Sequence, residues 1–256
     1  MKISIITATH NSLQHLPNVI SNIQQQTYVN IEYIVIDGGS LDGTVEYLKQ
    51  SNLISQIISE PDQGIYDALN KGINNATGDI IGFLHSDDIF ASPNTIASIA
   101  KVFSTPSIEN GGFPDVVYGD LVFIDPKDSD KVVRYWKSQP FTPNLLKRGW
   151  MPAHPTVFMR REVYQKHGLF NIDLKCAADY DYILRVFRDP TLNIAYLPEV
   201  ITNMRIGGVS TKGIKNLINK KKEDYWVLKN NKMHFPLWIL LLKNISKIPQ
   251  LIFRKR

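Results

Sequence analysis

The fold class is decided by residues 31–48, which read IEYIVIDGGSLDGTVEYL. The β-branched run Ile31–Ile36 predicts a buried strand, Gly38–Ser40 predicts a turn, and the residues through Val45–Leu48 predict a helix. A strand that leads through a short polar loop into a helix is one half of a parallel strand–helix–strand unit. This segment therefore predicts an α/β fold.

The same pattern recurs on both sides of that segment. It places strands at 3–7, 54–59 and 79–84, and helices at 13–26 and 65–76. Asn11 and Ser12 are candidate caps for the first of these helices. Strands that alternate with helices through short connections predict a mostly parallel sheet with helices on both faces and right-handed crossovers.

The second half of the chain is less regular. Residues 116–118 and 132–136 predict strands of a mixed, partly antiparallel extension, 140–155 a loop rich in proline, glycine and aromatic residues, and 179–188 a helix. We therefore expect one domain over residues 1–211, with halves at 1–105 and 106–211, and a separate helical appendage at 212–256.

The composition is that of an ordinary globular protein. Of the 256 residues, 43% are hydrophobic and 21% are charged, which excludes a disordered or collagen-like chain. The single cysteine, Cys176, cannot form an internal disulfide, so we expect a reducing compartment. The longest nearly unbroken apolar run, residues 235–242, is too short to span a bilayer. No apolar export signal precedes the first strand, and we expect a cytoplasmic protein.

Residues 212–256, here called the basic tail, differ from the rest in charge. They carry 12 Lys and Arg against two acidic residues, whereas the remainder carries 17 against 22. Trp238, Leu241, Leu242, Ile245 and Ile252 fall near one helical face, with Lys243 and Lys247 opposite and Pro249 interrupting the helix. This pattern of basic amphipathic helices fits an anionic membrane surface, and the alternative is a helix packed on its own domain. The acidic body and the missing recognition motifs argue against nucleic acid as a partner.

Four polar loops follow the four predicted parallel strands. They are Thr7–Asn11, Asp37–Ser40, Glu60–Gly64 and His85–Asp88. Ligands of such sheets bind beyond the carboxyl ends of the strands. Asp, Gly and Ser are common turn and cap residues, which explains any single loop but not all four together. The pair Asp87-Asp88 offers the oxygen ligands that Mg²⁺ or Mn²⁺ prefers.

Several familiar motifs are missing from the sequence. It has no GxGxxG after the first strand and no GxxxxGK[ST], which argues against a dehydrogenase and a P-loop NTPase. It also has no GxSxG and no HExxH. The acidic loops are therefore the main pointer to chemistry.

The loops and their flanking strands carry a family resemblance. The segments are Ile3–Asn11, Val35–Thr44, Asn70–Gly72 with Ala76–Asp79, and Phe83–Asp88. In this order they resemble the nucleotide-sugar half of family-2 inverting glycosyltransferases, which have the GT-A fold, and Ala177–Arg185 resembles their acceptor-side segment. The chain looks most like bacterial enzymes that extend lipid-linked O-antigen or exopolysaccharide repeat units.

The resemblance implies which residues bind the donor. Asp37 would accept a hydrogen bond from the base, typically the uracil imide, because a carboxylate is an acceptor. The base and ribose would be lined by Thr7, Thr9 and Asn11. Lys71 would contact base or phosphate as a point charge, and the alternative is a solvated helix lysine.

The resemblance also implies a metal, Mg²⁺ or Mn²⁺, that bridges the diphosphate. Asp87 would face the ribose and Asp88 the metal. Many relatives have Asp-x-Asp where this chain has His85-Ser86-Asp87, so His85 replaces the first carboxylate. The metal would then rest on Asp88, and we expect weak metal affinity without the nucleotide. His85 could instead contact phosphate.

Inversion by one displacement needs a base near the acceptor hydroxyl. Asp181 stands four residues before Arg185, where an ion pair explains it without function. The family segment, usually Glu-Asp and here Ala178-Asp179, selects Asp179 as the catalytic base, with a helix N-cap as its structural alternative. On the acceptor side the resemblance points to Trp150 and His154.

The sequence thus predicts an inverting transferase that moves a hexose-type sugar from a UDP-sugar to a lipid-linked saccharide acceptor. We expect it at the inner face of the plasma membrane as a peripheral protein. One rival is a sugar nucleotidyltransferase, which usually has a Gly-rich basic loop after its first strand that Thr7–Asn11 lacks. The other rival is a non-catalytic module that binds sugar nucleotides or membranes.

Overall fold

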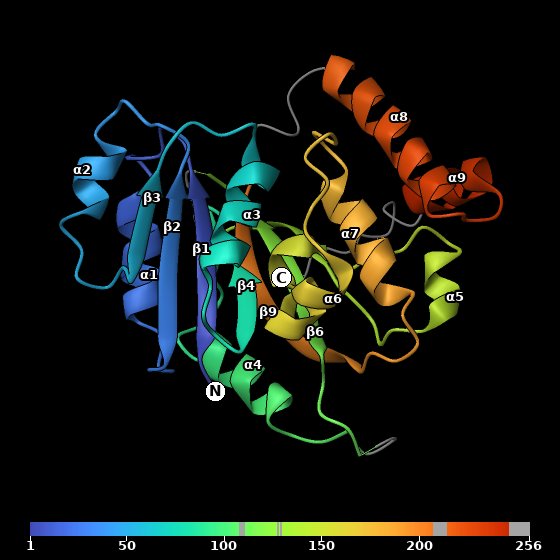
Figure 1. Cartoon of the computed structure of the whole chain (residues 1–256), viewed down its shortest axis with the longest axis horizontal. Helices are drawn as coiled ribbons and strands as arrows, with labels where there is room; N and C mark the ends of the chain where they lie inside the picture. The colour runs from blue at the N-terminus through green and yellow to red at the C-terminus, as the bar shows by residue number, and fades with distance from the viewer. Residues whose placement is uncertain (108–110, 127, 129, 207–213, 246–256) are drawn as a thin grey trace.

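The computed structural model describes residues 1–107, 111–126, 128, 130–206 and 214–245. Within them, nine strands form one sheet in the order β3-β2-β1-β4-β8-β6-β9-β5, with β7 paired to β6 (Figure 1). The strands are β1 Ile3–Thr9, β2 Ile31–Asp37, β3 Gln56–Ser59, β4 Ile80–Phe83, β5 Ile89–Phe90, β6 Val116–Ile124, β7 Val132–Trp136, β8 Phe158–Arg160 and β9 Ile194–Arg205.

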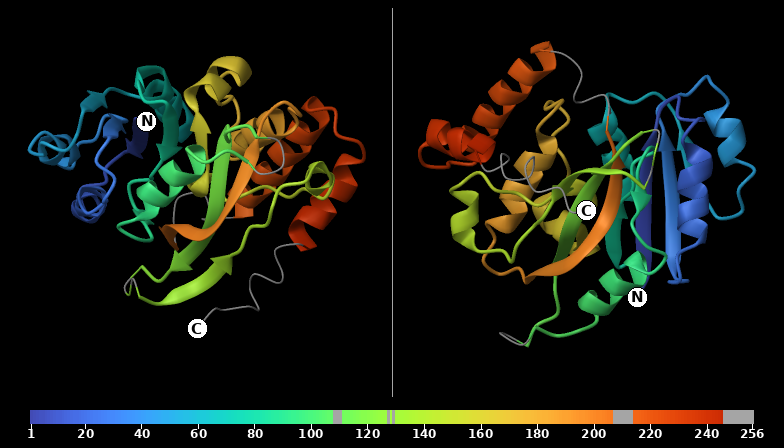
Figure 2. Two further views of the ribbon diagram at one scale, coloured as in Figure 1. Left: turned by 90° about the horizontal axis from the view of Figure 1, so that it is seen from below. Right: turned by 180° about the vertical axis from the view of Figure 1, so that it is seen from behind.

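Helices cover both faces of this sheet (Figures 1 and 2). They are α1 Leu16–Gln24, α2 Thr44–Leu48, α3 Ile65–Asn75, α4 Thr95–Phe103, α5 Pro143–Leu146, α6 Arg161–His167, α7 Ala178–Phe187, α8 Ile214–Asn230 and α9 Pro236–Ile245, with a 3₁₀ turn at His154–Thr156. In β1, Ile6 packs with the core under α3, α6 and α7, whereas Ile3 and Ile5 pack with the core under α1 and α4. This alternation buries the strand on both faces, as a parallel strand requires.

The first half confirms the predicted architecture. Strands β3, β2, β1 and β4 are neighbours and all parallel. Asp37 at the end of β2 lies in register with Thr9 on one side and Ser59 on the other. The carboxyl ends of the strands therefore bring the polar loops to one edge of the sheet.

The second half extends the sheet with both orientations, as expected. β8 is antiparallel to β4 and β6, β7 is antiparallel to β6, and β9 is parallel to β6. Within the segment 140–155, for which we expected only a loop, α5 and the start of the 3₁₀ turn form. The caps proposed for α1 are also wrong, because the helix begins after His15. Asn11 has φ of 49°, and its main-chain N–H donates to Ser40 in the neighbouring loop.

The helices α8 and α9 pack beside α7 through buried Val227, Leu228 and Ile239 (Figure 1). Gly149 has φ of 69°, and a Cβ there would lie 2.8 Å from Cβ of Lys243, so glycine permits this close approach. The boundary at residue 212 stays a prediction. Lys247, Pro249 and Ile252 lie outside the described residues. Within the described part of the chain, no helix has the length and apolar character needed to cross a bilayer.

Candidate active site

Asp37 is the most fully engaged carboxylate at the loop edge. Its two oxygens accept five hydrogen bonds, from the hydroxyls of Thr9, Ser40 and Ser59 and from the main-chain N–H groups of Gly39 and Ser40. Burial alone would raise the pKa of Asp37, but these bonds outweigh it and hold the pKa below its ordinary value. Its contact with a base stays a prediction, since both oxygens already have donors.

The other predicted donor residues also bind their own chain. The hydroxyl of Thr7 donates to the carbonyl of Leu84 at 2.6 Å and thereby ties β1 to the end of β4. The side-chain oxygen of Asn11 accepts from the N–H of Leu41 at 2.9 Å. Thr7, Thr9 and Asn11 therefore organise the loops, and their contacts with base and ribose stay predictions.

Asp62 is a residue that we did not single out from the sequence. Its Oδ1 accepts from the N–H of Gly64 at 2.8 Å, and among the described residues its Oδ2 has no hydrogen-bond donor. A Cβ on Gly38 would lie 2.4 Å from that Oδ2, so the carboxylate fills the space beside the Asp37 loop. Its signal in the sequence is a carboxylate in the loop after the third strand.

Lys71 reaches back to the same loop. Its ammonium lies 2.8 Å from Oε1 of Glu60 and 3.5 Å from Oδ2 of Asp67, and donates to the carbonyl of Pro61 at 3.0 Å. The hydrogen bond that Lys71 donates to Glu60 raises the pKa of Lys71. Lys71 is therefore neither a simply solvated lysine nor a free cation, and its contact with the donor stays a prediction.

Asp88 is fully buried, and among the described residues neither of its carboxylate oxygens has a hydrogen-bond partner of normal geometry. Burial and the charge of Asp87 raise its pKa well above the ordinary value, although the backbone and charge of Arg205 oppose this. Burying a carboxylate that has no hydrogen-bond partner costs free energy unless a cation binds it. Asp87 is half-buried and so more accessible than Asp88.

The residues at this edge fit a divalent ion that the substrate helps to hold. No cluster of three or more His, Cys, Asp or Glu side chains suited to a metal occurs in the described residues. Two neighbouring carboxylates with water and substrate phosphates are nevertheless a common Mg²⁺ arrangement. The weak affinity expected without the nucleotide stays a prediction.

Asp179, at the start of α7, faces a set of groups from distant parts of the chain. Its Oδ1 accepts from the hydroxyl of Tyr66 at 3.3 Å and from the N–H of Tyr180 at 2.8 Å. Its Oδ2 has no donor among the described residues. A half-buried carboxylate with one oriented and one open oxygen can accept a proton from a bound hydroxyl. Tyr66 is a second residue that our reading of the sequence missed.

His85 and His154 lie close enough to Asp179 for its charge to act on the pKa of both rings. Their ring centroids are 6.3 Å apart, and His154 also packs against Phe83 and Phe170. Burial lowers the pKa of His154 to about 4, although the charge of Asp179 opposes the shift. Burial likewise lowers the pKa of His85. Both rings are therefore neutral at pH 7, and within the described part of the chain each has a buried nitrogen without a partner.

Two other candidates have structural contacts. Asp181 pairs with Nε of Arg185 at 3.0 Å, as the spacing predicted, and accepts from Asn231 at 2.8 Å. Trp150 packs in an aromatic cluster with Phe141 and Phe187. Asp181 is thus fully explained by its partners, whereas the acceptor-side role of Trp150 stays a prediction.

Residues 4–168 match the family model described as Glycosyl transferase family 2. The chain belongs to this family. It is a glycosyltransferase with the GT-A fold, and it moves a sugar from a nucleotide sugar.

Relatives and solved structures agree with that assignment. A PGL/p-HBAD biosynthesis glycosyltransferase of Mycobacterium tuberculosis (strain ATCC 25177 / H37Ra) is 29% identical over 251 residues, which cover 96% of this chain and 91% of that protein. An uncharacterized glycosyltransferase of the same species is 35% identical over 188 residues, covering 72% of this chain and 68% of that one.

Among solved structures, TarS 1–349 from S. aureus has a TM-score of 0.67 at 16% identity and covers 97% of this chain and 72% of that one. It has also been solved with UDP and with UDP-GlcNAc. The mannosyltransferase PcManGT from Pyrobaculum calidifontis, solved with GDP-Man and Mn²⁺, has a TM-score of 0.61 at 16% identity, covering 100% of this chain and 76% of that one. At this identity both show the fold alone.

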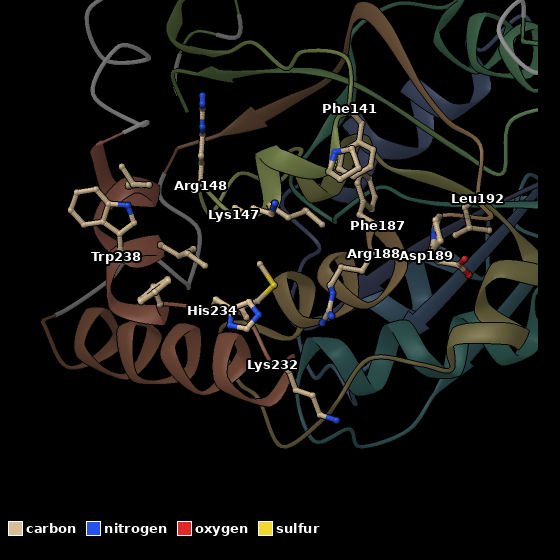
Figure 3. Close-up of a pocket in the computed structure, with 17 residues that line it drawn as sticks. Phe141, Lys147, Arg148, Phe187, Arg188, Asp189, Leu192, Lys232, His234 and Trp238 are labelled. Carbon is tan, nitrogen blue, oxygen red and sulfur yellow. The ribbon is translucent and has the colours of Figure 1, made fainter.

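One groove of this glycosyltransferase is lined by none of the residues of the polar loops, and Figure 3 shows the side chains that line it. It has a volume of about 1000 Å³ between α5, the end of α7 and α9. Phe141, Phe187 and Trp238 give it an apolar lining, and Arg148 and Lys232 belong to its basic part. Asp179 stands eight residues before Phe187 in α7, about 12 Å along the helix, so the groove is separate from the predicted base.

Proposed function

We propose that this glycosyltransferase inverts the anomeric centre and uses a UDP-sugar as donor and a saccharide as acceptor. The observation that carries the proposal is the open Oδ2 of Asp179, a carboxylate that Tyr66 orients through Oδ1 and whose charge acts on His85 and His154. A direct displacement needs one such base and no second nucleophile.

In the proposed reaction, Oδ2 of Asp179 takes the proton of an acceptor hydroxyl. The hydroxyl oxygen forms a bond to the anomeric carbon while the bond from that carbon to the β-phosphate oxygen breaks, and the electron pair leaves with UDP. Tyr66 orients the carboxylate through its hydrogen bond to Oδ1. The neutral rings of His85 and His154 wall the site without adding a charge.

UDP as the nucleotide is supported by the TarS complexes with UDP and UDP-GlcNAc, whereas PcManGT was solved with GDP-Man. Within this chain, the free Oδ2 of Asp62 is an acceptor suited to the imide N–H of uracil. Asp37 then shapes the loop that places the base.

A Mg²⁺ or Mn²⁺ ion at Asp87 and Asp88 is the second part of the proposal. Such an ion neutralises charge on the departing diphosphate. The orphaned oxygens of Asp88 support its presence. Mn²⁺ binding measured by calorimetry should be weak alone and at least tenfold tighter with UDP, and Asp88→Asn should remove that gain. Equal affinity with and without UDP would contradict a site shared with the nucleotide.

Product analysis tests the reaction. The enzyme is incubated with UDP-glucose, UDP-galactose and UDP-N-acetylglucosamine and a panel of saccharides, and the products are identified by NMR. We expect release of UDP and a product with β configuration from these α-linked donors. Release of pyrophosphate would favour a nucleotidyltransferase, and UDP binding without turnover of any donor would favour a non-catalytic module.

We further propose that the acceptor is lipid-linked, that the enzyme serves cell-surface polysaccharide synthesis such as O-antigen, and that it works in the cytoplasm on the inner face of the membrane. The outer face of α9 supports this location. Phe235 is 80% exposed and Trp238 is 59% exposed, whereas Lys243 turns inward. Because apolar side chains face solvent beside the basic part of the groove, this surface suits an anionic bilayer.

Vesicle sedimentation tests the membrane contact. Vesicles of phosphatidylglycerol and phosphatidylcholine should bind the protein, and Phe235→Ala with Trp238→Ala should weaken binding about tenfold or more. Val29→Ala is the matched control, since Val29 is 94% exposed in a different part of the chain. Equal binding by the double variant and the control would refute the membrane role of α9.

A further inference from the structure

The carboxylate of Glu223, in α8, lies at the start of the helix that carries Asp179. Three successive main-chain N–H groups, those of Lys175, Cys176 and Ala177, donate to its oxygens at 3.1, 2.7 and 3.0 Å. Successive N–H groups of this kind form an anion-binding concavity, here called the 175–177 nest. Ala177, at the N-cap of α7, has no side chain that could make a cap. Glu223, in the α8 part of the basic tail, therefore provides the cap that the start of α7 lacks.

A second contact holds the residue on the other side of Asp179. The ammonium of Lys243, in α9, lies 3.4 Å from the ring centroid of Tyr180 and 2.9 Å from Oδ1 of Asp224. Lys243 is 5% exposed and Asp224 is 7% exposed. A buried ion pair is weak evidence of stabilisation, because apolar residues of similar size often serve as well. What this contact does define is the place of α7 against α8 and α9.

The nest also reaches the polar loop Glu60–Gly64, here called the donor loop. Nζ of Lys175 donates to the carbonyl of Gln63 at 3.1 Å, and Gln63 follows Asp62 directly. Glu223 and the donor loop are therefore joined through the nest, and Asp179 follows the nest in the chain.

We propose that Glu223 is a positioning residue for the transfer reaction. By closing the 175–177 nest, it sets the direction of the Asp179 carboxylate relative to the donor loop. The proposal rests on the proposed function, in which Asp179 is the base. Asp179 follows the nest by two residues, so a shift of the nest moves its carboxylate, and a misplacement of about 1 Å costs about 100-fold in rate.

A double-mutant cycle tests this role, with UDP release from UDP-glucose, UDP-galactose and UDP-N-acetylglucosamine in the absence of acceptor as the measured rate. Glu223→Ala should lower the rate about 100-fold, and Glu223→Gln, which keeps one acceptor oxygen, about tenfold. The Kd for UDP should change less than about twofold. Asn219→Ala, exposed one turn earlier in α8, is the matched control and should keep the wild-type rate.

The decisive comparison is the Asp179→Asn background. There, Glu223→Ala should lower the residual rate less than about twofold, because residues that act as a unit are not additive. Equal fold-losses in both backgrounds would mean that Glu223 only holds the fold together, and would overturn the proposal. Wild-type rates in both Glu223 variants would overturn it too.

Failure of the proposed function has a different signature. An Asp179→Asn variant with the wild-type rate, or a wild-type enzyme that releases no UDP from any of the three donors, contradicts the proposed function itself. Circular dichroism melting accompanies every variant. If Glu223→Ala does not fold, Glu223→Gln carries the cycle with the same criteria.

Discussion

The predicted donor loops and the predicted acceptor side of this glycosyltransferase are built in opposite ways. On the predicted donor side, Asp37 receives three hydrogen bonds from Gly39 and Ser40 in its own loop and two from Thr9 and Ser59 at the ends of the adjacent strands, so these segments bind one another without any ligand. On the predicted acceptor side, among the described residues, His154 keeps a buried nitrogen without a partner and Asp179 keeps an open oxygen, and His85 in the loop after β4 likewise has a buried nitrogen without a partner. These three residues come from widely separated parts of the chain.

The difference separates side chains that hold the loops together from side chains that are available to bind a ligand. A carboxylate whose oxygens are all engaged has little left to offer a ligand, whereas an unpaired polar group in a walled site is costly unless a ligand joins it. By this criterion we expect Asp37 to act mainly as scaffold, and Asp62, Asp88 and Asp179 to be the carboxylates that bind substrate or metal. The family resemblance alone cannot make that distinction.

The largest expected effect is on the acceptor side. Asp179→Asn should lower turnover by a factor of about 10² to 10⁴, the usual range for a general base, while UDP affinity stays unchanged. Asp181→Asn is the control two residues away. It should keep turnover within about threefold and lower the free energy of unfolding by about 1–3 kcal/mol, because it weakens the ion pair with Arg185. Equal rate losses in the two variants would contradict the choice of Asp179.

On the donor side, Asp37→Ala should act mainly on stability. Loss of the carboxylate leaves five hydrogen-bond donors without an acceptor. We therefore expect a decrease of about 3 kcal/mol in the free energy of unfolding, measured by urea titration at pH 7. The folded-state pKa of Asp37 is lowered, so its contribution is present above the unfolded pKa of about 3.9 and disappears as pH falls through the folded pKa. Wild-type stability with lost UDP binding would instead make Asp37 a direct ligand contact.

The sequence predicted the donor half well because its signals are local. Each strand there runs directly into its loop, and the β-branched periodicity places every loop at the same edge. The short strand β8 gives no such signal, because its three residues form a strand only between β4 and β6. The long strand β9 was missed as well.

Only part of the site could be predicted, because only part of it has a local signal in the sequence. Asp179 was found through a motif, but Tyr66, Asp62 and Glu223 acquire their positions only from contacts with distant segments. Tyr66 lies 113 residues from Asp179 in sequence, and no periodicity relates the two. Helix geometry also failed to predict that Lys243 points into the protein, because the spacing of the apolar residues placed Lys243 on the face opposite to them.

The neutral histidines His85 and His154 should make the stability of the fold depend on pH. His154 has a pKa of about 4 in the fold and about 6.5 when unfolded, so between these values the unfolded chain binds a proton that the folded chain does not. Stability should therefore fall by about 2 kcal/mol from pH 7 to about pH 5 through His154 alone. His154→Gln should remove that part of the loss in urea titrations. Because His85 shifts in the same direction, some slope should persist. An unchanged slope would contradict a neutral buried His154.

The smallest effect should come from Asp62, and it tests the criterion itself. Asp62→Asn keeps the Oδ1 that accepts from Gly64 but removes the charge at the free Oδ2, so stability should change by less than about 0.5 kcal/mol. The Kd for UDP, measured by calorimetry, should rise about tenfold, because a charge-assisted bond to the base is weakened. An unchanged Kd would leave the free oxygen of Asp62 without a ligand, and a free carboxylate oxygen would then be no guide to substrate contact on the donor side.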